Sequence, residues 1–527
     1  MKNTRIESRL NLLVAAGRQN LLKGGLKGLE KESLRVTPSG RIAQTPHPEG
    51  LGSALKHPYI TTDYSEALIE LITPPFADSS DTLDFLDSIH RFVFQHIDTE
   101  ALWAASMPCE IEGEESIPIA YFGESNSGRM KHVYRRGLAW RYGRPMQSIA
   151  GIHFNYSVNE TFWPVLQDLL GDHSSIGSFI AGQYFGLIRN VQRNGWLVLY
   201  LFGSSPAFCK SFLTGREGLA SKFAEFDEAT LFKPYATSLR MSDIGYRNDS
   251  QSGLDISLNG LDEYVSSLVK AINTPYPDYQ GIGVKVDGEY RQLTANILQI
   301  SNEYYSPIRP KQIARSCENP TIALKRRGIR YIELRSMDLG IAHPLGLSLR
   351  EMHLLELFLL CCLLRESPLM GVGEKAEISS NALDVACRGR TPGLILRRGG
   401  KSVELREWAA ELAGDMRAVA EILDGGESDT VYQDSLAAVM GAIQYPEDTP
   451  SARVLAEMRE CKESFQAYTL RISQQHAERF RTRRLECEKA VELSLEAGKS
   501  LAGQRQAEES DGLSFEDFLG QYFSQVE

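Results

Sequence analysis

Hydrophobic and polar residues alternate between Gly28 and Val36 in a pattern that predicts a β-strand with an acidic face. Successive side chains of a strand point to opposite faces, so Glu30 and Glu32 are expected to lie on the same face. Two carboxylates held that close repel each other, and a divalent cation bound between them is one good reason to tolerate the repulsion. An edge strand whose solvated face is acidic is the alternative.

A second acidic segment runs from residue 61 to residue 75 and contains Asp63, Glu66 and Glu70 within an apolar run. As a helix, the three carboxylates would share one stripe; as a strand, Glu66 and Glu70 would share a face while Asp63 would belong to the entering turn. We expect a strand from about Glu66 to Thr73, because the run is short and ends in Thr-Pro-Pro, which a helix does not enter easily. An amphipathic helix is the alternative.

Aromatic and β-branched residues between positions 330 and 336 predict a third strand. Tyr331, Glu333 and Arg335 would share one of its faces. A carboxylate and a guanidinium two residues apart suggest a charged site. A surface ladder that pairs with neighbouring strands is the alternative.

A fourth strand is predicted for residues 149–157, where His153 and Asn155 would point the same way. A single histidine in such a place is more often a structural residue than a ligand.

The hydrophobic period becomes helical after about Leu347. The most apolar stretch, residues 353–364, is about three turns long and contains Glu356, which is typical of a buried core helix. Residues 371–400 contain several glycines and polar breaks and are expected to form a loop or an irregular bridge. The other predicted helical segments are residues 351–364, 402–423 and 451–499 and an amphipathic tail that ends near Glu527.

The chain is long enough to bury a substantial core, with 527 residues of which 42% are hydrophobic. No apolar run approaches the roughly 20 residues of a membrane span. Asn11 to Gly17 form an apolar patch that is better explained by a first amphipathic helix than by an export signal. We therefore expect a cytoplasmic protein that has no contact with a membrane.

The net charge of −11 argues against a nucleic-acid partner. The one dense basic run, Arg479 to Arg484, has glutamates around it and is expected to be a solvated helix face. Eight cysteines without CxxC spacing are typical of reduced thiols in a cytosolic enzyme, and no zinc site is indicated. Cys109 is expected to be a buried free thiol.

The order of the motifs along the chain resembles that of the bacterial glutamate–cysteine ligases (γ-glutamylcysteine synthetases) of the proteobacterial type. No comparable match extends over the last third, where the resemblance lies in length and helical character. The motifs that carry the resemblance are residues 28–36, 61–74, 106–109, 123–128, 152–157, 234–240, 306–311 and 331–336.

The resemblance implies an α+β fold similar to that of glutamine synthetase, with a mainly antiparallel sheet that forms the active site, outer helices and a helical C-terminal third. We expect one ligase unit over residues 1–527, with a motif-bearing catalytic part (1–346) and a mainly helical part (347–527). The implied reaction joins the γ-carboxylate of L-glutamate to the amine of L-cysteine through γ-glutamyl phosphate. ATP is consumed, γ-glutamylcysteine, ADP and phosphate are formed, and the reaction is the first step of glutathione biosynthesis.

Carboxylates from separate strands are suitable ligands for Mg²⁺, which prefers oxygen and shares its coordination with nucleotide phosphates. Mn²⁺ is a possible substitute. The catalytic candidate is Arg335, because a guanidinium binds two oxygens of a transferring phosphoryl group and stays charged. The predicted metal ligands are Glu30, Glu32, Asp63, Glu70 and Glu333, with His153 added by the resemblance.

The resemblance also implies a substrate pocket in which Arg240 binds a substrate carboxylate. Tyr64 stands where relatives often have phenylalanine, which adds a hydroxyl to the cysteine side, and Ser301 begins a run that usually starts with an acidic residue. Surface positions are the alternative for Arg135 and Arg240. The full set of predicted substrate-binding residues is Tyr64, Tyr134, Arg135, Leu138, Gln147, Asn155, Arg240, Tyr246 and Tyr305.

Two other functions are weighed against this one. The first is a related carboxylate–amine ligase that uses another amine, and the second is a catalytically silent binding protein that kept the fold. Feedback inhibition by glutathione is a further expectation, and no obligatory protein partner is expected.

Overall fold

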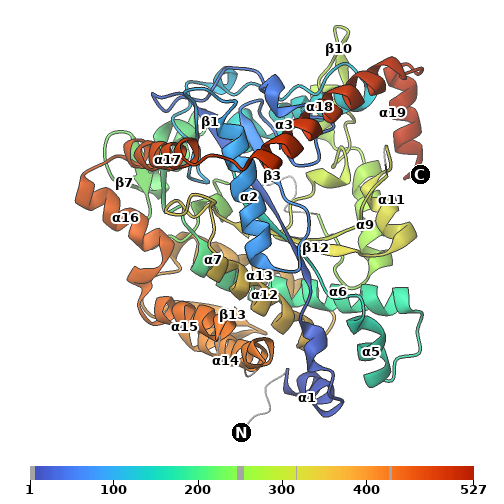
Figure 1. The fold of residues 1–527 in the computed structure, drawn as a ribbon, viewed down its shortest axis with the longest axis vertical. Coiled ribbons are helices and arrows are strands. Elements are labelled where there is room, and N and C mark those ends of the chain that lie inside the picture. The colour runs from blue at the N-terminus through green and yellow to red at the C-terminus, as the bar shows by residue number, and fades with distance from the viewer. Residues whose placement is uncertain (1–5, 246–253, 316, 426–429, 527) are drawn as a thin grey trace.

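The fold is built around one antiparallel sheet, seen at the centre of the ribbon in Figure 1. The computed structural model describes residues 6–245, 254–315, 317–425 and 430–526. Within this part of the chain the sheet has seven strands, in the order β11-β12-β5-β1-β3-β2 with β4 paired to β1. Their bounds are β1 Leu26–Val36, β2 Ile60–Thr62, β3 Leu68–Ile72, β4 Ala101–Leu102, β5 Ile152–Ser157, β11 Ile308–Lys311 and β12 Tyr331–Met337.

The strand predicted for residues 28–36 is the centre of the sheet and not an edge. β1 pairs antiparallel with β3 on one side and with β5 on the other. With 11 residues, β1 is the longest strand of the described part of the chain. The strands predicted at residues 149–157 and 330–336 are confirmed as β5 and β12.

The segment around Glu70 is a strand, as expected, but it begins later than predicted. β3 starts at Leu68 and ends at Ile72, so Glu66 precedes the strand. The Glu66 carboxylate accepts hydrogen bonds from the backbone N–H groups of His47 and Tyr121, both at 2.8 Å. These bonds hold Glu66 in the turn that leads into β3.

The outer face of the sheet is packed against helices α2 (Ser79–Phe94), α6 (Ile176–Asn194), α7 (Trp196–Phe202) and α12 (Leu349–Leu364). The other helices of the first two thirds are α1 Glu7–Ala15, α3 Asn126–Tyr142, α4 Arg144–Gln147, α5 Phe162–Leu169, α9 Leu261–Asn273, α10 Pro277–Ile282 and α11 Pro320–Arg327. Helices therefore also occur in the motif-bearing part, and the motif around Tyr134 lies on α3. The small strands are β6 Ala207–Cys209, β7 Ala224–Glu225 and β8 Thr230–Phe232, with the hairpins β9–β10 (Lys285–Val286, Glu289–Tyr290) and β13–β14 (Ile395–Arg398, Lys401–Glu404).

Alternate residues of β1 make polar contacts on this outer face. Lys27 Nζ lies 2.8 Å from Glu356 Oε1 of α12, and the two side chains are 3% and 1% exposed. Lys31 Nζ lies 2.8 Å from His90 Nε2 of α2, and burial lowers the pKa of Lys31 to about 7. The strand that carries Glu30 and Glu32 inward is thus held from behind by buried lysine contacts.

The predicted core helix at residues 353–364 is confirmed as part of α12, which is buried from Met352 to Leu364. Its start is fixed by a capping box, in which Ser348 Oγ accepts from the Glu351 N–H and the Glu351 carboxylate accepts from the Ser348 N–H.

The expectation of a loop over residues 371–400 is wrong. α13 occupies Val372–Arg388, and the β13–β14 hairpin begins in the same segment. The helix was hidden in the sequence because it buries few residues, chiefly Asn381, Val385 and Ala386, so its apolar stripe is narrow.

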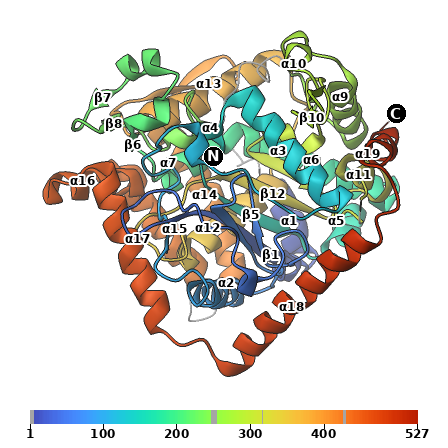
Figure 2. The ribbon, with the colours of Figure 1, turned by 90° about the horizontal axis from the view of Figure 1, so that it is seen from above.

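Helices dominate the remainder of the chain, and several of them run around the periphery of the molecule in Figure 2. The segment predicted as helical at residues 451–499 is divided among three helices. The helices after α13 are α14 Leu405–Asp424, α15 Val431–Gln444, α16 Pro450–Cys461, α17 Phe465–Thr482, α18 Cys487–Glu509 and α19 Phe515–Ser524.

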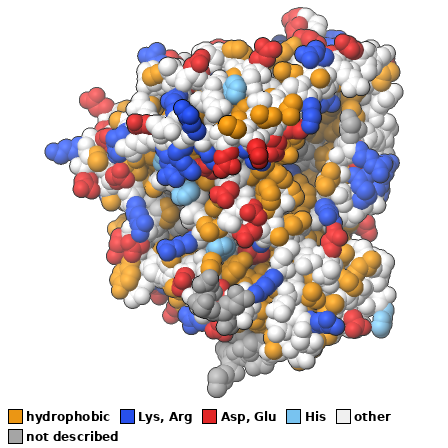
Figure 3. Space-filling model, viewed as in Figure 1, with side chains coloured by type: hydrophobic (Ala, Val, Ile, Leu, Met, Phe, Trp, Pro, Cys, Tyr) orange, Lys and Arg blue, Asp and Glu red, His pale blue; other side chains and the backbone are white. Residues whose placement is uncertain are grey.

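The basic run Arg479 to Arg484 is exposed, yet it is more than a solvated face. Arg481 donates to the carbonyl oxygens of Asp98 and Glu100, and Arg483 forms an ion pair of 3.0 Å with Asp87 of α2. Figure 3 shows acidic and basic side chains interspersed on the face where α2 and α18 lie.

Cys109 is a buried free thiol, as expected, and burial raises its pKa to about 12. Among the helices of the described residues, none combines the length and the apolar character that crossing a membrane demands.

Replacement of Lys27 by methionine is expected to destabilise the fold by about 3–5 kcal/mol, because it leaves the buried Glu356 carboxylate without its cation. Chemical denaturation of the variant and the wild type measures this difference. A double variant, Lys27→Met with Glu356→Leu, should recover part of the loss. A single variant as stable as the wild type would show that the pair does not hold β1 to α12.

Candidate active site

The register of the sheet brings five of the six predicted metal ligands together on its inner face, and the sixth, Asp63, lies in the segment between β2 and β3. Glu32 of β1 lies directly opposite Glu70 of β3, and Glu30 lies opposite His153 of β5. Glu333 comes from β12, which pairs with the far edge of β5. Four strands that are distant in sequence thus contribute side chains to one small region.

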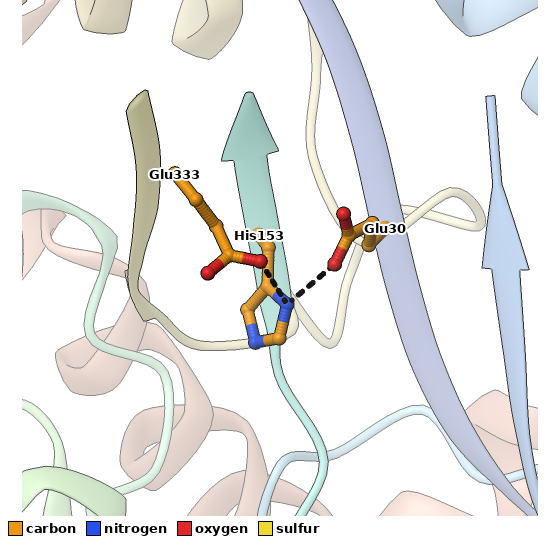
Figure 4. Close-up of side chains that lie close together, drawn as sticks. All are labelled: Glu30, His153 and Glu333. Atoms are coloured by element: carbon orange, nitrogen blue, oxygen red, sulfur yellow. Dashed lines mark hydrogen bonds and ion pairs between the residues drawn. The ribbon is translucent and has the colours of Figure 1, made fainter. Parts of the chain in front are cut away.

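The first group consists of Glu30, His153 and Glu333, which point toward one another in Figure 4. His153 Nδ1 is 3.0 Å from Glu30 Oε2 and 3.9 Å from Glu333 Oε1. The other oxygen of Glu30 accepts a hydrogen bond of 2.8 Å from Asn155 Nδ2. Asn155 therefore orients the Glu30 carboxylate.

The second group consists of Glu32, Glu70 and His153. His153 Nε2 is 3.6 Å from Glu32 Oε1, so one imidazole lies between the two groups. The backbone N–H of Gly151 donates to Glu32 Oε2 at 2.8 Å. Each group offers ligand atoms within 4.8 Å of one another, which is a donor set that a divalent cation could share.

Burial and repulsion between carboxylates together set the electrostatics of the second group. Burial and the Asp63 carboxylate raise the pKa of Glu32 to about 8. Burial, together with Glu30 and Asp63, raises the pKa of Glu70 well above its usual range. Like-charged residues directly opposite each other destabilise a sheet, and the guanidinium groups of Arg240 and Arg335 only partly offset the rise in the pKa of Glu32. The residues therefore fit one or more bound divalent cations.

Cationic side chains stand at the Glu333 end of the site. Arg335 Nη1 is 3.0 Å from Glu333 Oε2, and Lys311 Nζ is 3.0 Å from Glu333 Oε1. Although burial opposes the ionised form, these two cations hold the pKa of Glu333 well below its usual value. Burial alone would lower the pKa of Arg335, but Glu333 and Glu32 raise it above its ordinary value. Arg335 thus remains charged at the edge of the cluster.

A cavity of about 140 Å³ adjoins the carboxylates. It contains Glu32 and Asp63 on one side and the Arg335 side chain on another. The Asp63 carbonyl oxygen accepts a hydrogen bond from Arg135 Nε. Six of the predicted substrate-binding residues line it: Tyr64, Tyr134, Arg135, Leu138, Gln147 and Tyr305.

Three predicted substrate-binding residues lie elsewhere. Asn155 contacts Glu30, as described above. Arg240 is 1% exposed behind Gly151 and donates from Nη2 to the Arg335 carbonyl oxygen at 3.1 Å. A Cβ on residue 151 would lie 2.2 Å from Arg240 Nη2, so any larger residue there would displace the Arg240 guanidinium. Tyr246 falls outside the described residues.

A family model described as glutamate-cysteine ligase matches residues 10–385. The chain belongs to the glutamate–cysteine ligase family. It is 48% identical over 521 residues to a glutamate–cysteine ligase of Pseudomonas paraeruginosa, covering 99% of this chain and 98% of the relative. A glutamate–cysteine ligase of Azotobacter vinelandii is also 48% identical, with 98% of each chain covered.

Solved structures agree with this assignment. A glutamate–cysteine ligase from Francisella tularensis in complex with AMP superposes with a TM-score of 0.90 at 33% identity, covering 95% of this chain and 98% of that one. A bifunctional glutathione synthetase from Pasteurella multocida superposes with a TM-score of 0.69 at 24% identity, covering 91% and 55%, which shows likeness of fold alone. The predicted family and the predicted α+β fold are both confirmed.

Sequence reasoning missed several residues of the ligase cavity. One signal was available for Arg309, because it lies in the motif at residues 306–311 and is paired with Glu333 in the sheet register. The other residues lie on helix ends and loops whose convergence no local pattern reveals. The cavity-lining residues that were not predicted are Tyr142, Met146, Asn302, Glu303 and Arg309.

The raised pKa of Glu32 predicts how stability depends on pH and on metal. Between about pH 4.5 and about pH 8, Glu32 is protonated in the folded, cation-free protein but ionised in the unfolded chain. The folded state therefore binds more protons in that range, and the free energy of unfolding falls as pH rises through it. A bound divalent cation should remove the repulsion. Millimolar Mg²⁺ is therefore expected to raise the melting temperature more at about pH 8.5 than at about pH 6.

Differential scanning calorimetry at both pH values, with and without Mg²⁺, measures this effect. Glu32→Gln serves as the control, since it removes both the titration and one ligand and should shrink the pH dependence. Equal Mg²⁺-induced shifts at the two pH values would contradict the prediction.

Proposed function

We propose that this chain is an ATP-dependent ligase that joins the γ-carboxylate of L-glutamate to the amine of L-cysteine and forms γ-glutamylcysteine, ADP and phosphate. Membership of the family supports this function, and so do its relatives, which carry the name of that activity. The observation that carries it is the junction of a carboxylate cluster with a cavity lined by Arg135, Arg309 and Arg335. Clustered carboxylates suit a metal–nucleotide, and guanidinium groups suit anionic substrates.

The reaction needs activation of the γ-carboxylate because oxide is a very poor leaving group. An oxygen of that carboxylate attacks the γ-phosphorus of ATP, the bond to the β-phosphate oxygen breaks, and ADP leaves. The cysteine amine then attacks the acyl carbon of γ-glutamyl phosphate, phosphate leaves, and the amine loses a proton to solvent. The product enters glutathione biosynthesis as its first intermediate.

Phosphoryl transfer depends mainly on positioning and on neutralisation of charge. Arg335 is assigned to the transferring phosphoryl group, because its guanidinium stands beside Glu333 and 3.5 Å from His153 Nδ1. The Glu333 ion pair holds Nη1 of that guanidinium, and Nε has no acceptor among the described residues. Asn155 and Gly151 fix the carboxylates of Glu30 and Glu32 in the same way.

Mg²⁺ is the proposed ion, with Mn²⁺ as a possible substitute. Bound there, it would supply charge that neutralises the phosphate oxygens of ATP during transfer. The residues proposed to hold it are Glu30, Glu32, Asp63, Glu70, His153 and Glu333. His153 suits this role in its neutral form, and burial and Arg335 lower its pKa.

The substrates are assigned to the cavity. Its polar and aromatic wall of Tyr64, Tyr134 and Tyr305 would enclose the cysteine side, with Leu138 against the thiol. Gln147 and Arg135 add polar contacts. From the sequence alone, Arg240 is assigned to a substrate carboxylate and Tyr246 to the cysteine side; Arg240 lies outside the residues that line this cavity.

The function is tested by measuring ADP release from Mg-ATP in the presence of glutamate, with and without L-cysteine. The product is then identified by mass spectrometry. Cysteine-dependent release with γ-glutamylcysteine formed is the expected result. ADP release that requires glutamate but does not respond to cysteine would contradict cysteine as the acceptor and indicate that another amine is used. Absence of ADP with every substrate combination would indicate a binding protein.

Arg335→Ala is expected to fold and to lose about 100- to 1,000-fold in kcat, since it removes one electrostatic partner of the transferring group. Steady-state kinetics measure the loss, and circular dichroism verifies the fold. Arg326→Gln, in which an exposed arginine of α11 loses its charge, is the matched control and should keep wild-type activity. Near-normal turnover in Arg335→Ala would overturn the assignment.

We further propose feedback inhibition by glutathione, because that peptide contains the γ-glutamylcysteine portion of the product. Millimolar glutathione is expected to reduce the initial rate, and an unchanged rate would reject this regulation. The proposed setting is the cytoplasm, without an obligatory protein partner. ATP is available there, and thiols such as those of the eight cysteines stay reduced.

A further inference from the structure

Arg309 stands near the edge of the central sheet with its side chain in the wall of the substrate cavity. It lies on β11, directly opposite Glu333 of β12. It lines the cavity together with Tyr134 and Tyr305, and only 8% of its surface is exposed. Its guanidinium is therefore removed from bulk water and adjoins the space that a substrate would occupy.

The polar contacts of Arg309 are with backbone carbonyls and not with a carboxylate. Nη2 donates to the carbonyl oxygen of Asn302 at 3.0 Å and to that of Tyr304. Nε is buried and has no acceptor in the part of the chain that the structure describes. The guanidinium therefore keeps donors that the protein itself does not use.

Two buried carboxylates near Arg309, one in the cavity wall and one on the neighbouring strand, already have cations of their own. Glu303 forms an ion pair of 2.8 Å with Arg141, and both side chains are almost completely buried. Glu333 pairs with Arg335 at 3.0 Å. Across the described residues, no carboxylate comes within ion-pair distance of Arg309.

A buried cation without a counter-ion is costly, and a guanidinium cannot avoid that cost by giving up its proton at neutral pH. A bound anion would reverse this penalty. Because carboxylates and guanidinium groups match in a planar, two-bond geometry, a carboxylate is the anion that fits best.

We propose that Arg309 binds the α-carboxylate of an amino-acid substrate in this cavity. The inference rests on the proposed function, since that function supplies two substrates that each carry such a group. The position of Arg309 on β11, beside the strand that bears Arg335, places the bound carboxylate near the phosphoryl-transfer centre but outside it. Arg309 is thus a specificity residue that selects amino acids over simple amines or simple acids.

The test compares each amino acid with the analogue that lacks only its α-carboxylate. Cysteamine replaces L-cysteine in one pair, and 4-aminobutyrate replaces L-glutamate in the other. The ratio of kcat/KM within each pair is measured for the wild type and for Arg309→Gln; where an analogue turns over too slowly, its inhibition constant is used. Arg326→Gln is again the control for a lost surface charge.

Arg309→Gln is expected to reduce the preference for the amino acid by roughly 10- to 150-fold in one pair, the loss that follows from removing a hydrogen bond to a charged group. The pair that is affected identifies which substrate's α-carboxylate Arg309 binds, and the preference in the other pair should be unchanged. Preferences in both pairs equal to those of the wild type would overturn the proposal.

Two further measurements separate this role from a structural one and from failure of the proposed function. The variant must keep the melting temperature and ADP affinity of the wild type. If it does not, Arg309→Lys replaces it, because lysine keeps the charge but not the two-bond geometry. In that variant the preference for the amino acid over its analogue should fall roughly 10-fold in the same pair. An equal loss for the amino acid and its analogue in both pairs would overturn the proposal. Failure of the proposed function would appear earlier, as absence of cysteine-dependent ADP release in the wild type.

Discussion

Repulsion between carboxylates on the inner face of the sheet is the constraint on which the rest of the structure depends. Glu32 and Glu70 are directly opposed across two paired strands, and Glu30 and Glu333 lie on either side of a single histidine. Left unbalanced, such a group would push the strands apart or keep its members protonated. The fold holds it in place with well-packed surroundings and pairs Glu333 with Arg335 and Lys311. A bound cation is proposed to neutralise the remaining charge.

The outer face of the same strand supplies part of that support. Lys27 and Lys31 point away from the site and contact α12 and α2, so β1 is fixed by its helices independently of what binds on its inner face. The inner face is then available to bind ligands. Arg335 and Arg309 extend the charge pattern from the carboxylates into the cavity, where one faces the proposed phosphoryl centre and the other a proposed substrate carboxylate.

Local sequence patterns were sufficient to predict much of the sheet. The period of two in β1, β5 and β12 identified which residues share a face, because that property depends on each strand alone. The pairing of Glu32 with Glu70 and the burial of Arg309 depend on register and packing between distant segments, which periodicity does not contain. α13 was missed for a related reason, since a helix that buries so few residues shows little amphipathic signal.

Calorimetric titration of the nucleotide-free protein with Mn²⁺ at about pH 7, in two buffers of different ionisation enthalpy, tests the central claim most directly. Because burial and repulsion raise the pKa of Glu32 to about 8 and that of Glu70 well above its usual range, the account predicts that binding of the ion releases protons. Glu32→Gln with Glu70→Gln is predicted to abolish the release. Binding that releases no protons would show that these carboxylates are already ionised and that repulsion among them does not organise the site.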